Sequence, residues 1–307
     1  MLGALRVEAQ VDSNLLREEW RSENHWVDSY DKPFFVLKGK DADGETFGAF
    51  HWDSLGRFKL DREDAHPSAW GGYKILTISI GTNAPFAENG LYDIGLAVAG
   101  KLGRLGENWT LEASGGVATA NDGHFSNTEA IYPAATVVAQ HQIAPREFLQ
   151  LGVTYDGNSE LLPGMPLPVI EYEAVLGPSV KFRAGFPHAQ VEYRPWPSVA
   201  LQLMAEYPTN ARFHGEVDIG AGFRLFTEVQ RRIDGFHQDD AGRDRVFVLL
   251  HTAEGGLRFV TSWIDVSLSG GWTFGNEVFT GYDMREHEQT YRPGNRPMIA
   301  LTVQGTF

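Results

Sequence analysis

The sequence of 307 residues contains no cysteine. That absence excludes a disulfide-stabilised scaffold, a thiolate metal site and a cysteine nucleophile. Basic residues are also scarce: 26 Lys and Arg stand against 40 Asp and Glu, which gives a formal charge of −14. Because phosphate groups are bound by clustered basic side chains, this balance argues against a nucleic-acid partner.

Long hydrophobic runs are missing as well. No run of about 18 apolar residues occurs, which excludes a transmembrane helix. A membrane β-barrel is not excluded, because only every second residue of its strands has to be apolar. The N-terminus lacks the basic and apolar segments of a signal peptide, so the chain is either cytoplasmic or a mature or truncated form.

The sequence is rich in glycine and aromatic residues, with 34 Gly, 19 Phe, 10 Tyr and 8 Trp, and this skew favours β structure. Apolar and polar residues alternate with period two along most of the chain, as in half-buried strands. The clearest segments are 5–11, 91–102, 180–186, 199–207, 217–232 and 264–274; weaker ones lie near 46–52, 73–81, 109–117, 134–142, 147–155, 169–175 and 245–252. The fold is therefore predicted to be all-β.

The alternation alone does not say which face lies inside. Several segments exceed the usual five or six residues of a soluble strand and approach the roughly 9–11 needed to cross a bilayer. Their polar face is charged or glycine-rich, which suits a wet or ion-paired barrel interior. The alternative is a soluble β-sandwich or lipocalin-like barrel with its aliphatic residues inward. On the alternation alone, both interpretations stand equally.

The connections divide into short and long ones. Gly177-Pro178-Ser179 and Pro187-His188-Ala189 are short, whereas 53–70, 119–130, 156–168, 234–244 and 283–297 read as longer loops. Residues 14–33 read as a long loop, or as a short helix or plug segment capped by Asp12-Ser13-Asn14. Because no linker or break in composition appears, residues 1–307 are predicted to form a single domain.

The last residues carry the most specific signal. Counting back from the terminal Phe307, one face of the segment holds Gly305, Val303, Leu301 and Ile299. This pattern resembles the terminal strand of bacterial outer-membrane proteins, although Gly305 stands where a bulkier residue is commoner. The resemblance implies a transmembrane antiparallel up-and-down β-barrel in outer-membrane lipid, closed by this strand and recognised by the barrel-assembly machinery. The missing signal peptide is then explained by its removal or by truncation.

A second resemblance covers roughly residues 160–307. The stretches Leu167-Pro168-Val169-Ile170-Glu171-Tyr172, Phe186-Pro187 and Val191-Glu192-Tyr193-Arg194 resemble an uncharacterised family of bacterial outer-membrane proteins. The shared pattern is a Leu-Pro strand start, a strand ending in Phe-Pro and a following strand with a central Tyr. Since that family has no assigned activity, the resemblance bears on fold and location and not on substrate.

Counting segments predicts about 12 strands, within 10–14, with long loops on one side of the barrel and short turns on the other. In such a barrel the charged face would line the lumen. The candidates are Arg6, Glu8, Asp93, Lys101, Glu112, Lys181, Arg183, Glu206, Asp218, Arg224, Glu228, Arg232 and Arg258. We therefore predict a channel for passive or weakly selective passage of small polar solutes. The alternatives are a non-conducting structural or adhesive barrel and a soluble binding module.

Aromatic residues are expected near strand ends, where membrane interfaces favour amphipathic rings. The candidates are Trp70, Tyr73, Tyr92, Trp109, Tyr172, Tyr193, Trp196, Tyr207, Trp263, Trp272 and Tyr282. If the protein were instead a sandwich, these rings should fall in the middle of strands and pack in its core.

No cofactor or metal is predicted. The ten histidines are scattered without ligand spacing. Two oxygen-rich segments, Asp41-Ala42-Asp43-Gly44-Glu45 and His237-Gln238-Asp239-Asp240, are better explained as polar hairpin loops than as cation sites. The sequence also contains no G-x-S-x-G motif, and the protein is predicted not to be an enzyme. A hydrolase at the barrel rim, built from His251, Asp265 and Ser267, is a minor alternative.

Overall fold

The computed structural model describes residues 26–40, 46–61, 68–82, 90–207, 210–239 and 244–307, and almost all of them lie in strands. The strands are β1 (Val27–Lys40), β2 (Thr46–Lys59), β3 (Ala69–Thr82), β4 (Gly90–Leu105), β5 (Trp109–Asn121), β6 (Ile131–Ala144), β7 (Glu147–Asp156), β8 (Pro166–Leu176), β9 (Val180–Phe186), β10 (His188–Trp196), β11 (Val199–Glu206), β12 (Asn210–Gly220), β13 (Phe223–His237), β14 (Arg245–Val260), β15 (Ile264–Thr273), β16 (Glu277–Gly281), β17 (Gln289–Tyr291) and β18 (Arg296–Thr306). A single turn of 3-10 helix, η1 (Thr128–Ala130), precedes β6. In these ranges no helix has the length and apolar character to cross a membrane.

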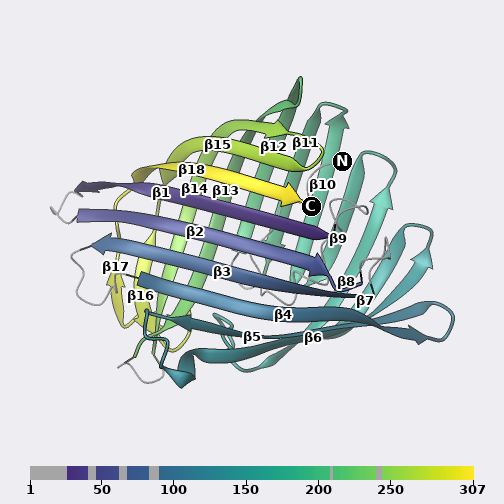
Figure 1. Ribbon diagram of the computed structural model, residues 1–307, viewed down its shortest axis with the longest axis horizontal. Helices are drawn as coiled ribbons and strands as arrows, with labels where there is room; N and C mark the ends of the chain where they lie inside the picture. Colours follow the sequence, from purple (N-terminus) through teal and green to yellow (C-terminus); the bar gives the residue numbers. More distant parts are fainter. Residues whose placement is uncertain (1–25, 41–45, 62–67, 83–89, 208–209, 240–243) are drawn as a thin grey trace.

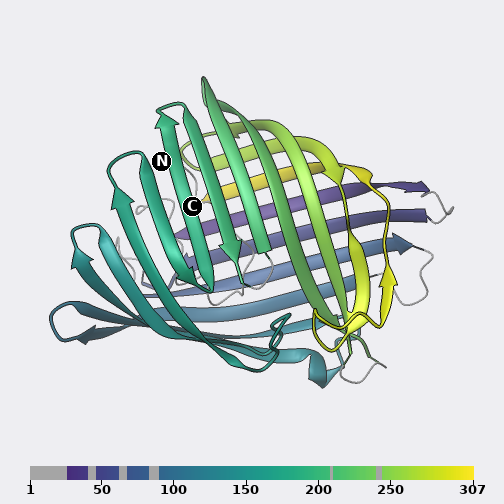
Figure 2. The same ribbon diagram turned by 180° about the vertical axis from the view of Figure 1, so that it is seen from behind.

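The sheet closes on itself as an antiparallel up-and-down barrel (Figures 1 and 2). From β1 to β15, each strand pairs with the next along the chain, and β18 then joins β15 to β1. The closed ring has 16 strands. The short strands β16 and β17 lie outside it and extend the sheet from the loop-side half of β14. The predicted barrel architecture is confirmed.

The predicted number of strands was wrong, and one turn shows why. The segment 217–232 reads as one strand but contains the end of β12, a two-residue turn and most of β13. Across that turn Val217 pairs with Leu225, so odd-numbered residues face outward in both strands. The hydrophobic alternation therefore runs through the turn without interruption. Only the backbone of Ala221, with φ 54°, and its flanking glycines mark the reversal.

Other boundaries also differ from the prediction. The expected loop 14–33 overlaps β1, which begins at Val27. It escaped detection because its inward residues include Asp28 and Lys32 while its outward residues include Asp31, so hydrophobicity does not alternate there. Strand β14 continues to Val260, well beyond the predicted 245–252. The expected strand 5–11 and residues 14–25 lie outside the described residues.

The aliphatic face of the sheet lies outside and the charged face inside. In β4 the outward Leu96 is 65% exposed, whereas the inward Asp93 is only 5% exposed. Leu257, Leu268 and Leu301 pair side by side on three adjoining strands and form an exposed outer row. The expectation for a soluble barrel, with aliphatic residues inward, is contradicted because this arrangement leaves large apolar side chains in contact with the surroundings.

The two ends of the barrel differ in their connections. At one end, which we call the short-turn end, successive strands are joined at 106–108, 145–146, 177–179, 197–198, 221–222 and 261–263. The opposite end, the loop end, carries the longer connections 122–130, 157–165 and 274–295, the last of which contains β16 and β17. Some connections depart from the predicted pattern. At the loop end, Pro187 alone joins β9 to β10 and residues 207–209 join β11 to β12, whereas at the short-turn end residues 60–68 lie between β2 and β3.

Strand β18 closes the ring against β1, with Ser29 opposite Gly305. Ile299, Leu301 and Phe307 are exposed on the outer face, while Val303 is half-buried. Gly305 is needed where it stands, because a Cβ atom there would lie 2.6 Å from the ring of Phe307. The small residue thus makes room for the terminal aromatic ring.

Exposed aromatic rings gather near the short-turn end. Trp196, Phe259 and Phe307 are exposed at or beside the last residues of their strands, and Trp263 is exposed in the turn before β15. Near the loop end, Tyr207 and Tyr282 are also exposed. Trp70 differs from the sequence-based expectation because it is buried on the inner face of β3.

Candidate functional site

The lumen is divided by β13. Its pairing with β12 ends at Ala211 and Arg231, yet β13 continues to His237, which pairs with Asn121 of β5 on the opposite wall. Figure 2 shows the loop-side ends of the green strands meeting the blue-teal strands of that wall. At the loop end, one compartment is therefore enclosed by β13–β15, β18 and β1–β5, and the other by β5–β13. Towards the short-turn end β13 pairs with β12 in the barrel wall, and inward side chains of both strands border the first compartment. We call the two compartments the filled compartment and the polar compartment.

Apolar side chains fill the loop end of the filled compartment. They come from both walls and pack in a single cluster, which includes Phe34, Val36, Phe47, Leu76, Ile78, Ile80, Leu91, Phe236, Val246, Val248, Val278 and Met298. All of these are nearly inaccessible to solvent. Since a close-packed apolar cluster excludes water, this end of the filled compartment is sealed.

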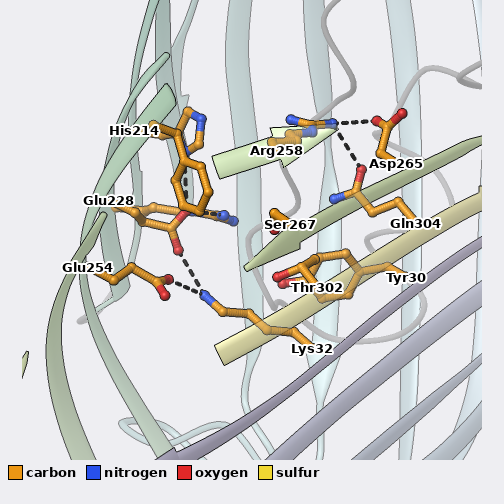
Figure 3. A pocket seen from close by; sticks show the side chains of 12 residues that line it. Tyr30, Lys32, His214, Glu228, Glu254, Arg258, Asp265, Ser267, Thr302 and Gln304 are labelled. Atoms are coloured by element: carbon orange, nitrogen blue, oxygen red, sulfur yellow. Dashed lines mark hydrogen bonds and ion pairs between the residues drawn. The ribbon is translucent and has the colours of Figure 1, made fainter. Parts of the chain in front are cut away.

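Below the cluster, charged side chains bridge the filled compartment (Figure 3). The Nζ atom of Lys32 on β1 lies 3.0 Å from a carboxylate oxygen of Glu228 on β13 and 2.7 Å from one of Glu254 on β14. The other carboxylate oxygen of Glu254 accepts a hydrogen bond of 2.6 Å from the Ser269 hydroxyl. These contacts cross the lumen and tie β1 to the wall that faces it.

Glu228 is the centre of this network. Besides Lys32, it binds the guanidinium of Arg212, and the Nδ1 atom of His214 lies 3.1 Å from the same carboxylate. All four side chains are almost fully buried. A buried carboxylate that meets several cations is held ionised, because each neutralises the charge that burial would otherwise oppose.

The network continues towards the short-turn end through Glu216 and Arg258. Glu216 accepts hydrogen bonds of 2.6 Å from Arg224 and 3.2 Å from Arg258. Arg258 also donates to Asp265, at 2.6 Å, and to Gln304, at 3.4 Å. The cavity within the network is small, about 30 Å³, and is crossed by these ion pairs (Figure 3).

Two further ion pairs lie closer to the loop end. Arg232 on β13 donates to Asp53 on β2, at 2.9 Å, and so links walls that face each other across the lumen. On β3, Lys74 donates to Asp93 at 2.8 Å. The Tyr132 hydroxyl donates to the other oxygen of Asp93, at 2.9 Å. Inward charges are thus paired with one another both across the lumen and between neighbouring strands.

The polar compartment has a different lining. Its inward side chains include Gln140, Gln150, Gln190 and Glu192, which are half-buried and so partly accessible to solvent. Towards the short-turn end the compartment opens into a hollow of about 430 Å³ bordered by Arg104, Gln140 and Gln142 among others. These polar, accessible side chains mark the part of the lumen that water can enter.

At the loop end the polar compartment narrows to an acidic cavity of about 60 Å³. The charged groups in its lining are Lys74, Asp93, Asp156, Glu160, His188, Glu206 and Asp234. Carboxylates thus outnumber cations. His188 lies between two carboxylates: its Nδ1 atom is 3.2 Å from Glu171 and its Nε2 atom 2.7 Å from Glu206. The cavity is suited to cationic or polar species rather than to anions.

The connection 157–165 between β7 and β8 covers this cavity. The side chains of Asn158 and Ser159 are buried, and the Asn158 amide donates a hydrogen bond of 2.9 Å to the carbonyl of Gly235 on β13. The amide of Met284 in the 282–288 loop donates to the carbonyl of Glu160, at 2.9 Å. We call residues 157–165 the inward loop. It limits access to the polar compartment from the loop end.

The inward loop carries a carboxyl group of altered acidity. Burial, with Asp156 nearby as a second cause, raises the pKa of Glu160 from 4.5 to about 8. The folded protein therefore binds a proton at this site that the unfolded chain would release between these two values. The stability that this proton confers is complete below pH 4.5 and is lost as the pH rises through about 8.

We expect the inward loop to open more readily as the pH rises through about 8, because the charged form of Glu160 is disfavoured by its surroundings. Amide hydrogen exchange of residues 157–165, corrected for intrinsic rates, measures this opening. Glu160→Gln keeps a neutral side chain and should remove the dependence. Equal pH profiles for the wild type and Glu160→Gln would contradict the assignment to this carboxyl.

The structure places the candidate lumen residues on the inner register of the barrel wall, apart from Arg6 and Glu8, which lie outside the described residues. Lys101 and Glu112 face each other near the short-turn end. Lys181 and Arg183 contact Glu173 at 3.3 and 2.7 Å. Asp218 is largely exposed beside the 221–222 turn, where it accepts a hydrogen bond from the amide of Gly220.

Sequence reasoning missed several members of the network, namely Lys32, Asp53, Arg212, His214, Glu216 and Glu254. Glu216 and Arg212 share the parity of Asp218, so extending the alternation to the start of β12 would have found them. Lys32 had no such signal, because the outward face of β1 is not regularly apolar.

The minor alternative of a rim hydrolase is not supported by the geometry. Asp265 and Ser267 are buried on the inner face of β15, whereas His251 has the outward parity of β14 and contacts the carbonyl of Gly275. Within the described residues, no group of three or more His, Asp or Glu side chains is arranged to hold a metal ion. Residues 41–45 and Asp240 of the two oxygen-rich segments lie outside the described residues.

No protein-family model matches the sequence, and no curated protein matches it. Among solved structures, the chain is similar to the outer-membrane protein Omp33 of Acinetobacter baumannii, with 7% identity and a TM-score of 0.37 over 94% of this chain and 100% of that one. It is similar to OprB of Pseudomonas putida, with 8% identity and a TM-score of 0.33 over 92% and 94%. A mutant porin from Rh. blastica shows 9% identity and a TM-score of 0.27 over 92% and 99%. With TM-scores this low, the architecture described above rests on the strand pairing of this chain and not on these similarities.

Proposed function

We propose that the protein is a bacterial outer-membrane barrel that allows small polar solutes, cations in preference to anions, to pass through its polar compartment. The observation that carries this proposal is the closed barrel with its aliphatic face outward and with accessible polar side chains along the polar compartment. An outward row such as Leu257, Leu268 and Leu301 matches the lipid-facing band of a membrane barrel.

The orientation follows from the connections. In outer-membrane barrels the short turns face the periplasm and the longer loops face outward. The short-turn end would then be periplasmic, with Trp196, Trp263 and Phe307 in the aromatic girdle at that interface. Outer-membrane lipid and, through the terminal strand ending at Phe307, the barrel-assembly machinery are the proposed partners.

The route for solutes runs through the polar compartment alone. The filled compartment offers none, because apolar packing closes one end and ion pairs bridge the rest. In the polar compartment, solutes would move between the hollow bordered by Gln140 and the acidic cavity under the inward loop. The carboxylates of Asp156 and Glu206 would favour cations there.

Planar-bilayer recording of the refolded protein tests this proposal. We expect small, stable conductance steps and, across a salt gradient, a reversal potential of the sign that marks cation preference. Changing Asp156 to Asn should reduce that preference, because it removes a carboxylate from the cavity lining. Glu277→Gln is the matched control, since Glu277 pairs with the exposed Arg292 away from this cavity. The absence of current at all voltages would exclude a channel.

A non-conducting structural barrel is the second candidate, and one observation favours it. The contact between His237 and Asn121 draws opposite walls together at the loop end, which reduces the open cross-section. The same recordings separate the two functions. A barrel that inserts and folds but passes no current would support the structural role.

A further inference from the structure

Arg245, the first residue of β14, is the side chain on which two loops converge. It is 2% exposed and is among the largest fully buried side chains of the described residues. Its guanidinium lies 4.8 Å from the centre of the Phe247 ring. No carboxylate of the described residues lies within ion-pair distance of it. A buried guanidinium without an ionic partner needs several neutral acceptors instead.

The inward loop provides part of this set of acceptors. One terminal nitrogen of Arg245 donates to the backbone carbonyl of Asn158, at 3.1 Å, and to its side-chain oxygen, at 3.0 Å. The other donates to the backbone carbonyl of Ser159, at 3.1 Å. Because two of these acceptors are peptide carbonyls, the contacts fix the backbone of the loop and not merely a side chain.

The 282–288 loop provides the rest. Nε and one terminal nitrogen of Arg245 both donate to the carbonyl of Tyr282, at 3.2 and 3.1 Å. The neighbouring Asp283 is engaged by Arg285 instead. The planar fork of Arg245 thus joins two loops that are far apart in the sequence, and a lysine with a single nitrogen could not reach all of these acceptors.

We propose that Arg245 is a latch that holds the inward loop over the loop end of the polar compartment and thereby sets how wide that compartment opens. Arg245 is a positioning residue: it does not line the acidic cavity, whereas Asn158 and Ser159, which it holds, do. The consequence for conduction rests on the proposed channel function. The position of the inward loop does not depend on the channel function, and it can be measured separately.

The absence of native cysteine allows a direct test, because one introduced thiol is then the single reactive site. Ser159→Cys places it in the inward loop, where the side chain is 6% exposed. A membrane-impermeant maleimide should label this thiol slowly in the refolded barrel. Adding Arg245→Met should raise the labelling rate by about tenfold or more, because opening of the loop no longer breaks these hydrogen bonds.

Arg245→Lys, which keeps the charge but loses the fork, should give an intermediate rate. It also keeps the test decisive if Arg245→Met fails to fold. Arg292→Met is the matched control, because Arg292 is an exposed arginine that contacts Glu277, and it should leave labelling unchanged. Unchanged labelling in both Arg245 variants would overturn the latch.

Single-channel recording of the same variants separates the latch from the channel. Increased conductance in Arg245→Met, together with faster labelling, supports both. Faster labelling without current in any variant, the wild type included, supports the latch and overturns the channel. Faster labelling with wild-type conductance would show that the inward loop does not limit the route and would overturn the role of Arg245 in setting its width.

Discussion

Changing Glu228 to Gln is expected to lower the free energy of unfolding by about 3–5 kcal/mol. The carboxylate of Glu228 is buried and meets Lys32, Arg212 and His214 inside the barrel. Its replacement by a neutral amide leaves buried cations without their counter-charge, which costs far more than losing a solvated charge. Denaturant unfolding in detergent micelles or liposomes, followed by tryptophan fluorescence, measures the loss.

The matched control is Glu192→Gln. Glu192 also points inward but is half-buried in the polar compartment, where it accepts a hydrogen bond from Gln190. We expect a loss below about 1 kcal/mol at this site, because a solvated charge gains little from its partners. If Glu228→Gln were as mild as Glu192→Gln, water would have to reach the ion-pair network, and the filled compartment would not be closed.

Leu268→Arg should destabilise the barrel in a lipid bilayer by about 2–4 kcal/mol. Leu268 lies in the middle of β15 on the outer face and is 61% exposed, with Leu257 and Leu301 on either side. In lipid this position would bring a guanidinium close to the middle of the hydrocarbon layer. Reversible unfolding in liposomes is the direct measurement.

Depth provides the control for this prediction. Leu105→Arg makes the same chemical change on an exposed outward residue at the short-turn end of β4. Near the interface the cost should fall to about 0–1 kcal/mol, because the side chain reaches water and headgroups. Equal effects of the two substitutions would mean that the outer face does not lie in a lipid layer, and the outer-membrane proposal would fail.

The faces of the sheet could be predicted because alternation is a local property. Asp93 and Leu96 have opposite parity in one strand, and once the aliphatic face was taken as outward, each was assigned to its correct side. The number of strands depends on where the chain turns, and the hydrophobic pattern of the sequence marks these turns only weakly. At 221–222 parity is conserved through the turn, and at Val27 the strand begins without an apolar pattern.

The partners of the inward charges could not be predicted in the same way. Arg232 and Glu228 were recognisable from the parity of β13, but Asp53 and Lys32, which they contact, lie on strands that face them across the lumen. Such contacts depend on how far β13 curves inward, and no short-range pattern records that curvature. Arg245 likewise has an outward parity that conceals its buried contacts with two loops.

The seam between β1 and β18 has a consequence for how the barrel is made. Its partners, such as Asp28 and Thr306, come from opposite ends of the described chain, so the ring cannot be completed until β18 is available. A chain that loses β18 would leave both β1 and β15 with a row of unsatisfied backbone N–H and C=O groups. Such edges recruit strands from other molecules, so incomplete chains should aggregate rather than persist as smaller barrels.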